Sequence, residues 1–454
     1  MFDPVDIAKL TQGRWLGTPP AQAPLLFGHD TRKPLEGGMY VAIRGEAHDG
    51  HDFMEEARAA GATMALVDRE IESTIPCLLV SDTIESLAVL ASHWRDRLEG
   101  TRVLAITGTA GKTTTKDLLQ HVLGSALRGT ASPASWNNSI GGPMSLLRAR
   151  PGDDYVILEM GTSSPGEIAT LARCARPDVA IITLIGRGHL EGLDSLDGVR
   201  KEKLSLLDSL APGGTAIIHE DGQDVQVPEG TTLFRHGDGA AACPGLVSRD
   251  SGVIRLNDGS IFTFPIAGRH QAINALAVIA AARDAGMEDQ AISDALATSV
   301  PSKGRGAEST TGGIRFIDDA YNANPESVAA ALDAFPEVES TGRRIVILGD
   351  MLELGAQEDH LHAALLEPIL ASHARMAIDE VILIGRAMES LAAQIQDTAS
   401  LAVSHWNALD EPAMDSVVSR LASGDLVLIK ASRGMRLEQI IRKTGGLESE
   451  ATTA

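Results

Sequence analysis

The chain has 454 residues, more than one hydrophobic core usually supports, so two to four domains are expected. Its composition is 44% hydrophobic but only 3% aromatic, which predicts a core of Ala, Val, Ile and Leu side chains, as in many α/β proteins. The formal net charge of −22 argues against a nucleic-acid binder, because a phosphate backbone requires a basic protein face. No apolar stretch approaches the roughly 20 residues that span a bilayer, so we expect a cytoplasmic protein without membrane insertion.

The predicted elements fall into three domains, of which the first covers residues 1–99. Short apolar runs predict its strands at 39–43, 64–67 and 77–80, and a longer periodic stretch predicts a helix at 84–98. The second domain covers residues 100–307, where strands alternate with helices. It contains expected strands at 155–160 and 179–184, a glycine-rich β segment at 213–265 and a helix at 271–285.

The third predicted domain, residues 308–446, repeats the alternation of strand and helix and indicates a second βαβ sheet. Its expected strands are 314–317, 344–348, 380–384 and 425–430, and its expected helices are 327–335, 359–371 and 436–442. We expect residues 447–454 to form a disordered tail. The sequence therefore favours an α/β fold with three domains.

A strand, a glycine loop and a helix open the second domain. The loop, residues 108–116, reads GTAGKTTTK, and this arrangement cradles the phosphates of a nucleoside triphosphate. Its glycines let backbone N–H groups approach phosphate oxygens, Lys112 adds a positive charge, and the hydroxyl of Thr113 suits Mg²⁺. Ile106 stands where the usual motif has its first glycine, and a bare GxxGKT string also occurs in surface turns. The flanking strand and helix favour the phosphate loop.

Glu159 and His189 are further candidates for the same site. Glu159 ends one apolar run and His189 follows another, so we expect both at the carboxyl edge of the sheet, where open α/β sheets bind ligands. A carboxylate and an imidazole there suit a second Mg²⁺ or its water shell. Taken singly, each residue is also compatible with a solvated carboxylate or a loop histidine that binds nothing.

Eight segments resemble those of Mur ligases, in the same order. The resemblance runs from about Asp30 to Glu438. The segments IDDAYNANPES and LGDMLELG are the most specific, because they resemble the family members that add D-alanyl-D-alanine to UDP-N-acetylmuramoyl-tripeptide. The eight segments are 108–116, 136–147, 158–168, 186–192, 268–274, 317–327, 348–355 and 428–438.

This resemblance implies an ATP-dependent amide ligase of peptidoglycan precursor synthesis. Such an enzyme activates the tripeptide carboxylate as an acyl phosphate, joins it to D-alanyl-D-alanine and releases ADP and phosphate. The resemblance implies ATP and Mg²⁺ as cofactors and a monomer. It also implies a small N-terminal UDP-sugar-binding domain, a central P-loop ATPase-like domain and a C-terminal Rossmann-like domain, each α/β.

The resemblance also implies residue roles. Lys112 is expected on the β- and γ-phosphates with the loop residues Gly108, Thr109, Ala110, Gly111, Thr113 and Thr114. Asn274 resembles an asparagine near the adenine, Arg305 an arginine directed at the phosphates, and Asp319 the aspartate that holds the ribose. Thr113 is expected on the first Mg²⁺, and Glu159 and His189 on the second. The expected substrate-binding residues are Asp30, Thr31, Arg32, Asp49, Gly50, His51, Asn138, Tyr321, Asn322, Asn324, Lys430, Ser432 and Arg433.

Some positions depart from the family pattern. Leu184 and Gln271 replace usual asparagines, and Arg187 lies in a stretch that is normally small and neutral. Lys203 aligns with the lysine that relatives carry as a carbamate and use as a metal ligand, but Leu204-Ser205 replaces the Gly-Glu that commonly follows. An ammonium group cannot bind a metal ion, so the carbamate requires a pKa depressed by burial near cations. The alternative is a lysine on a helix surface.

Other functions stay open on sequence grounds. A related ligase for another muramyl step or for folate polyglutamylation shares the ATP-binding core, although DDAYNANP argues against it. A P-loop kinase or GTPase is disfavoured by the loop spacing and by the second βαβ domain. A nucleotide-binding scaffold without catalysis is compatible with Leu184 and Gln271.

Overall fold

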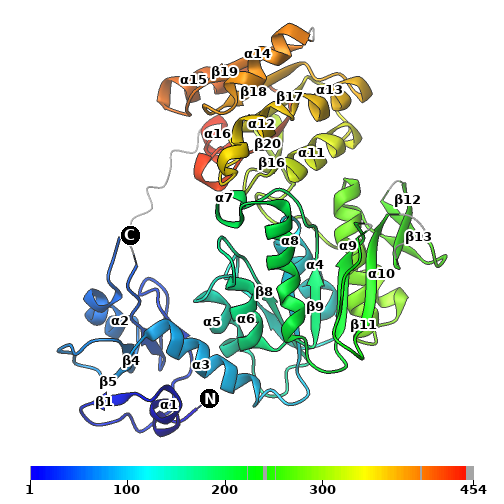
Figure 1. The fold of residues 1–454 in the computed structure, drawn as a ribbon. Helices are drawn as coiled ribbons and strands as arrows, with labels where there is room; N and C mark the ends of the chain where they lie inside the picture. The colour runs from blue at the N-terminus through cyan, green and yellow to red at the C-terminus, as the bar shows by residue number, and fades with distance from the viewer. Residues whose placement is uncertain are drawn as a thin grey trace.

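A computed structural model describes residues 2–45, 47–221, 223–238, 243–250, 252–398 and 401–445. The tail expected at 447–454 lies outside the described residues. Three β-sheets follow one another along the chain, and Figure 1 shows the central one between the other two. The predicted α/β fold with three domains is confirmed, and the exact boundaries stay a prediction. No described helix is long and apolar enough to cross a membrane.

The first sheet has the order β1-β5-β4-β3-β2, parallel except for β1. Its strands are β1 (Arg14–Leu16), β2 (Phe27–Gly28), β3 (Met39–Val41), β4 (Met64–Val67) and β5 (Cys77–Leu79). Its helices are α1 (Pro4–Thr11), α2 (Met54–Ala59) and α3 (Thr83–Arg95). The side chain of Asp82 caps α3 by accepting the N–H of Glu85 at 2.8 Å, which fixes where this predicted helix begins.

The central sheet has the order β14-β13-β12-β11-β10-β9-β6-β8-β7. Its strands are β6 (Arg102–Thr107), β7 (Gly129–Ala131), β8 (Tyr155–Glu159), β9 (Val179–Ile182), β10 (Thr215–His219), β11 (Thr232–Asp238), β12 (Gly245–Asp250), β13 (Val253–Leu256) and β14 (Ile261–Thr263). Strands β6, β8 and β9 pair in parallel and are apolar on both faces, which is typical of a sheet covered by helices on both sides.

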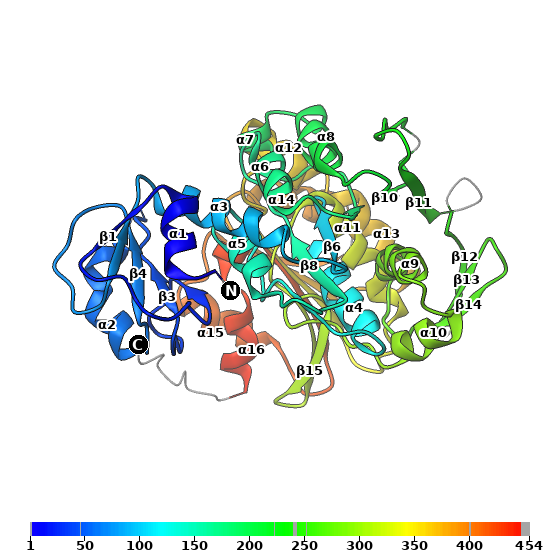
Figure 2. The ribbon, with the colours of Figure 1, turned by 90° about the horizontal axis from the view of Figure 1, so that it is seen from below.

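Alternate residues of these strands face two different cores. Val103 and Ala105 pack towards α3, α5 (Gly141–Arg148) and α6 (Glu167–Ala175). Leu104 and Ile106 pack towards α4 (Lys112–Gly124) and α9 (Arg269–Asp284) on the other face. Helix α3 therefore joins the first domain to the central sheet, and Figure 2 shows it beside α5. The remaining central helices are α7 (Leu190–Leu193), α8 (Leu196–Leu204) and α10 (Asp289–Ala297).

The third sheet has the order β15-β16-β20-β17-β18-β19, parallel except for β15, as predicted for a second βαβ sheet. Its strands are β15 (Ala307–Thr311), β16 (Ile314–Asp319), β17 (Arg344–Gly349), β18 (Glu380–Ile384), β19 (Ala402–Trp406) and β20 (Leu426–Lys430). Its helices are α11 (Pro325–Ala334), α12 (Glu358–Ala363), α13 (Leu366–Arg375), α14 (Glu389–Thr398), α15 (Glu411–Arg420) and α16 (Glu438–Thr444).

The single helix expected at 359–371 is wrong, because α12 and α13 are separate helices. The ring of Pro368 lies in the first turn of α13. Proline has no N–H to donate, and its ring clashes with the carbonyl four residues earlier, which here belongs to Ala364 at the end of α12. The helical segment is therefore interrupted between Ala363, where α12 ends, and Leu366, where α13 begins.

Candidate active site

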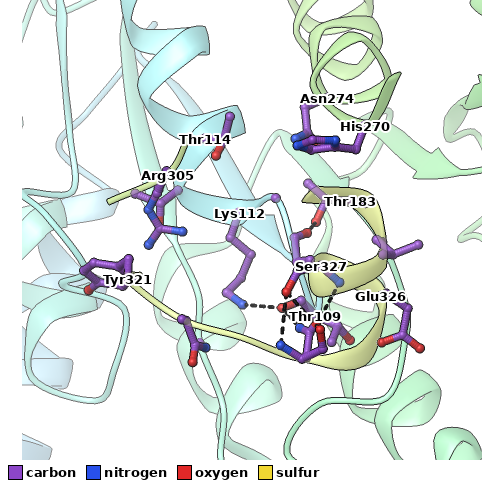
Figure 3. Close-up of a pocket in the computed structure, with 18 of the residues that line it drawn as sticks. Thr109, Lys112, Thr114, Thr183, His270, Asn274, Arg305, Tyr321, Glu326 and Ser327 are labelled. Carbon is purple, nitrogen blue, oxygen red and sulfur yellow. Dashed lines mark hydrogen bonds between the residues drawn. The ribbon is translucent and has the colours of Figure 1, made fainter. Parts of the chain in front are cut away.

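A cavity of about 380 Å³ lies between the carboxyl ends of the central strands and the third domain (Figure 3). Ligand sites of open α/β sheets lie at this edge. The second and third domains both contribute to its wall, so the structure brings together residues that are far apart in sequence. The predicted site residues that line it are Thr109, Ala110, Gly111, Lys112, Thr113, Thr114, Glu159, His189, Asn274, Arg305, Asp319, Tyr321, Asn322, Asn324 and Lys430.

The phosphate loop between β6 and α4 requires both of its glycines. Gly108 and Gly111 have φ values of +151° and +85°. A Cβ atom on Gly108 would lie 2.0 Å from the Thr183 hydroxyl oxygen, and one on Gly111 would lie 2.5 Å from Asn274 Oδ1. The loop is pinned to the end of β9, because the Thr109 N–H donates to the Leu184 carbonyl at 2.6 Å. That bond uses only the backbone of Leu184, so the missing asparagine does not remove it.

The Lys112 side chain folds back over the same loop. Its Nζ donates to the Gly108 carbonyl at 2.7 Å and to the Thr109 carbonyl at 3.4 Å, and Figure 3 shows the amine reaching towards Thr109. Burial lowers the pKa of this amine, the charge of Glu159 opposes that shift, and Arg305 adds to it. The amine is therefore held at the loop whose N–H groups suit phosphate oxygens, and a bound phosphate would favour its charged form.

Glu159 ends β8 with a carboxylate that is only 1% exposed. Its Oε1 accepts a hydrogen bond from Asn137 Nδ2 at 2.9 Å, while its Oε2 is buried without a hydrogen-bond partner. Lys116 Nζ lies 3.8 Å from that oxygen. A buried carboxylate oxygen without a partner is costly, and a metal ion is one group that satisfies it. The cavity wall therefore fits Mg²⁺ at Glu159.

His189 adopts a left-handed backbone with φ +58°, and its ring meets the third domain. Nδ1 lies 2.5 Å from Oε2 of Glu353, and that hydrogen bond lowers the pKa of the Glu353 carboxyl. Glu353 itself has φ +65°. A carboxylate on one ring nitrogen orients the imidazole, as is typical for a histidine that binds a metal. The sequence did not identify Glu353, although it lies in the LGDMLELG segment.

Lys203 on α8 is completely buried, and its Nζ has no hydrogen-bond partner. The expected alternative, a helix-surface lysine, is therefore wrong. Burial, and then the charge of Lys112, lower the pKa of this amine well below its usual value, against the opposing charges of Glu202 and Glu167. The Glu202 carboxylate already accepts the backbone N–H groups of residues 166 and 168. The Glu167 carboxylate accepts those of residues 163 and 164. Lys203 is not among the residues that line the cavity.

The third domain contributes a network of charged and aromatic groups. Lys430 Nζ donates to Asp319 Oδ2 at 2.6 Å and to the Asn322 carbonyl at 3.1 Å. Asn324 caps α11 and places its Nδ2 3.5 Å from the Thr109 carbonyl. Arg187 pairs with Glu326 on the first turn of α11, because its N–H donates at 2.9 Å. The unusual Arg187 is thus a contact between two domains.

Two predicted C-terminal residues lie outside the cavity wall. The Ser432 hydroxyl is buried and accepts the N–H of Leu352 at 2.9 Å, so it supports the loop after β17. The guanidinium of Arg433 lies 5.4 Å from the ring of Tyr321. Asn138 is also outside the wall, and its Oδ1 accepts the N–H of Gly141, the first residue of α5, at 2.9 Å.

The structure does not bring the predicted N-terminal residues to the cavity. Asp30 pairs with Arg32, and Thr31 lies between them. Asp49 accepts the backbone N–H of His51 at 3.0 Å, and a Cβ on Gly50 would lie 2.5 Å from the N atom of Ile43. The buried ring of His51 accepts the N–H of Asp68 at 3.2 Å, which gives this segment a supporting role in the first domain.

Known proteins resemble the chain along most of its length. Three protein-family models match the chain. They are "Mur ligase family, catalytic domain" at residues 26–95, "Mur ligase middle domain" at 106–282 and "Mur ligase, glutamate ligase domain" at 305–433. The UDP-N-acetylmuramoyl-tripeptide–D-alanyl-D-alanine ligase of Bacillus subtilis is 33% identical, over 96% of this chain and 97% of its own.

Two solved structures have the same fold. A crystal structure of MurF from Acinetobacter baumannii gives a TM-score of 0.84 at 26% identity, covering 98% of this chain and 99% of that one. MurF from Thermotoga maritima in complex with ADP gives a TM-score of 0.79 at 26% identity, covering 93% and 97%. The chain therefore belongs to the Mur ligase family and is a ligase.

Proposed function

We propose that the protein joins D-alanyl-D-alanine to UDP-N-acetylmuramoyl-tripeptide with ATP, as a cytoplasmic step of peptidoglycan precursor synthesis. One observation carries the proposal. A single cavity combines the phosphate loop at Lys112 with the DDAYNANP segment at Tyr321 and Asn324. The Bacillus subtilis ligase, which is named for this reaction, matches 96% of the chain, and MurF from Thermotoga maritima matches 93%.

The chemistry requires the groups that the cavity holds. A carboxylate is a poor electrophile, so ATP must convert it to an acyl phosphate before the amine attacks. Lys112 and Arg305 line the cavity as cations and would neutralise charge on the transferring phosphoryl group. Closure of the two domains over the bound substrates would keep water from the acyl phosphate.

Mg²⁺ would be held by Thr113, Glu159, His189 and, as a carbamate, Lys203. When bound, it supplies positive charge to the phosphoryl oxygens. The described residues contain no group of three His, Cys, Asp or Glu side chains placed to hold a metal ion. A carbamate and phosphate oxygens would complete the ligand set, which explains why Lys203 matters to the proposal.

The remaining proposed roles concern the nucleoside part of ATP and the UDP-sugar. Asn274 lies against the phosphate loop at Gly111 and is proposed to contact the adenine. Asp319 is proposed to hold the ribose, and Lys430 fixes the Asp319 carboxylate. The Asp30–Arg32 and Asp49–His51 segments are proposed to receive the UDP-sugar in the first domain.

The test is substrate choice in a phosphate-release assay. D-alanyl-D-alanine is expected to release phosphate only when UDP-N-acetylmuramoyl-tripeptide and ATP are both present. Single amino acids should be at least about 100-fold poorer, because a site that pairs the distant carboxylate of the dipeptide loses that interaction with a shorter amine. Controls omit each substrate in turn.

The other outcomes identify the alternatives. Equal turnover with a single amino acid would assign the protein to another Mur ligase step. Turnover with a folate substrate would assign it to polyglutamylation. The absence of phosphate release with every pair of substrates would favour a scaffold without catalysis.

A further inference from the structure

The segment 132–138, between β7 and α5, is tied to the phosphate-loop helix. Ala134 within it has φ +46°, a left-handed backbone that a non-glycine residue rarely adopts. Lys116, one turn into α4 and 2% exposed, donates from Nζ to the Ser132 carbonyl at 3.0 Å and to the Ala134 carbonyl at 2.5 Å. A buried cation on α4 therefore holds the unusual backbone in place.

The next residue, Ser135, meets the third domain. Its Oγ accepts a hydrogen bond from the Tyr321 hydroxyl at 2.7 Å. The Tyr321 ring also contacts two cations, because the Arg305 guanidinium lies 4.1 Å from its centroid and that of Arg433 lies 5.4 Å away. Figure 3 shows Tyr321 and Arg305 together on one side of the cavity. Ser135 is therefore hydrogen-bonded to Tyr321, whose ring contacts both arginines.

Trp136 meets the first domain. Its ring lies 6.0 Å from the His29 ring at a tilt of 54°, and Lys33 Nζ lies 5.4 Å from its centroid, a cation–π distance. His29 and Lys33 flank Asp30, Thr31 and Arg32. The indole thus contacts both ends of the segment that is proposed to receive the UDP-sugar.

Asn137 meets the proposed metal ligand in the central domain. Its Nδ2 donates to Glu159 Oε1 at 2.9 Å, and its carbonyl accepts the N–H of Gly161 at 2.8 Å. Three consecutive residues therefore contact the third, first and central domains in turn. Consecutive Cα atoms lie about 3.8 Å apart, so these three contacts fall within a span of two peptide units.

We propose that Ser135, Trp136 and Asn137 are positioning residues that place Tyr321, the His29–Lys33 segment and Glu159 relative to one another. This inference rests on the proposed function and adds to it. Through these residues, the sugar-nucleotide segment and the third domain are held in register with the phosphate loop. Turnover requires all three parts in register at once, so we expect it to depend on these residues more steeply than nucleotide binding at the phosphate loop does.

A double-mutant cycle tests the bond to the third domain. Ser135→Ala and Tyr321→Phe each remove one end of the same hydrogen bond and keep the fold and the aromatic ring. Each is expected to lower kcat about tenfold, and the double variant no further, because both changes delete one interaction. The Kd for ADP with Mg²⁺, measured by calorimetry, should stay within about twofold of wild type, since the phosphate loop is untouched. Ser139→Ala, an exposed serine nearby, is the matched control and should leave kcat unchanged.

Trp136 provides a second readout. UDP-N-acetylmuramoyl-tripeptide should change the intrinsic fluorescence of the wild type, and Trp136→Phe should lose that change and raise the KM for this substrate without weakening ADP binding. Multiplicative losses in the double variant, or full kcat in both single variants, would overturn the inference. A wild-type protein that releases no phosphate with the two proposed substrates would instead contradict the proposed function.

Discussion

Replacing Lys112 with alanine is expected to abolish ligation and leave the protein folded. The amine is held over the phosphate loop by the Gly108 and Thr109 carbonyls, where it would meet the proposed phosphates. Losing such a charge typically costs several kcal/mol of transition-state energy, so phosphate release should fall by a factor of about 100 to 1,000 or more. The measurement is the phosphate-release assay with both substrates, beside a thermal melt that reports folding.

The control for this variant is Lys9→Ala, which removes an exposed lysine from α1. It should keep the wild-type rate. Near-normal turnover in Lys112→Ala would remove this lysine from the catalytic assignment, and a collapsed melting temperature would make Lys112 a folding residue.

Lys203→Ala is expected to lower turnover by a factor of about 100 or more, because it removes a proposed metal ligand that no neighbouring side chain replaces. Lys203→Arg should not restore the rate, since a guanidinium keeps the charge but cannot form the carbamate. The depressed pKa of the buried amine supplies the neutral form that adds carbon dioxide. Depleting bicarbonate should slow the wild type and leave the residual rate of Lys203→Ala unchanged.

Lys201→Ala is the matched control, because Lys201 lies two residues earlier on the same helix and is exposed. Protein equilibrated with ¹³C-labelled bicarbonate gives a direct readout: the wild type should show a carbamate carbon signal that Lys203→Arg lacks. Normal turnover of Lys203→Arg, or no labelled carbamate in the active wild type, would restrict the metal ligands to Thr113, Glu159 and His189.

Much of the fold could be predicted because the central strands are apolar along almost their whole length. Strands β8 and β9 are buried along their whole length and read as continuous apolar runs, so their identity depends little on context. The strands that the sequence did not reveal are short or lie at sheet edges. Strand β15 reads AESTT and is largely exposed, and β19 reads AVSHW and is half-buried. Both lie at edges of the third sheet, and neither carries a continuous apolar run.

The phosphate loop could be predicted because its function depends on local residues. The rest of the site depends on contacts between domains, which spacing along the chain does not encode. The hydrogen bond from Tyr321 to Ser135 joins residues 186 positions apart, and the contact of Glu353 with His189 joins residues 164 apart. At Leu184 the structure shows a backbone contact, from the Thr109 N–H to the Leu184 carbonyl, which does not depend on the side chain at this position.

The cavity shared by two domains has a consequence for how the protein unfolds with heat. Lys112, at the start of α4, lies on one wall and Lys430, at the end of β20, lies on the other, so the two walls belong to different domains. A ligand that touches both walls binds only when both domains are folded, so its binding free energy stabilises the two together. In scanning calorimetry, saturating ADP with Mg²⁺ should therefore merge separate domain transitions into one at higher temperature.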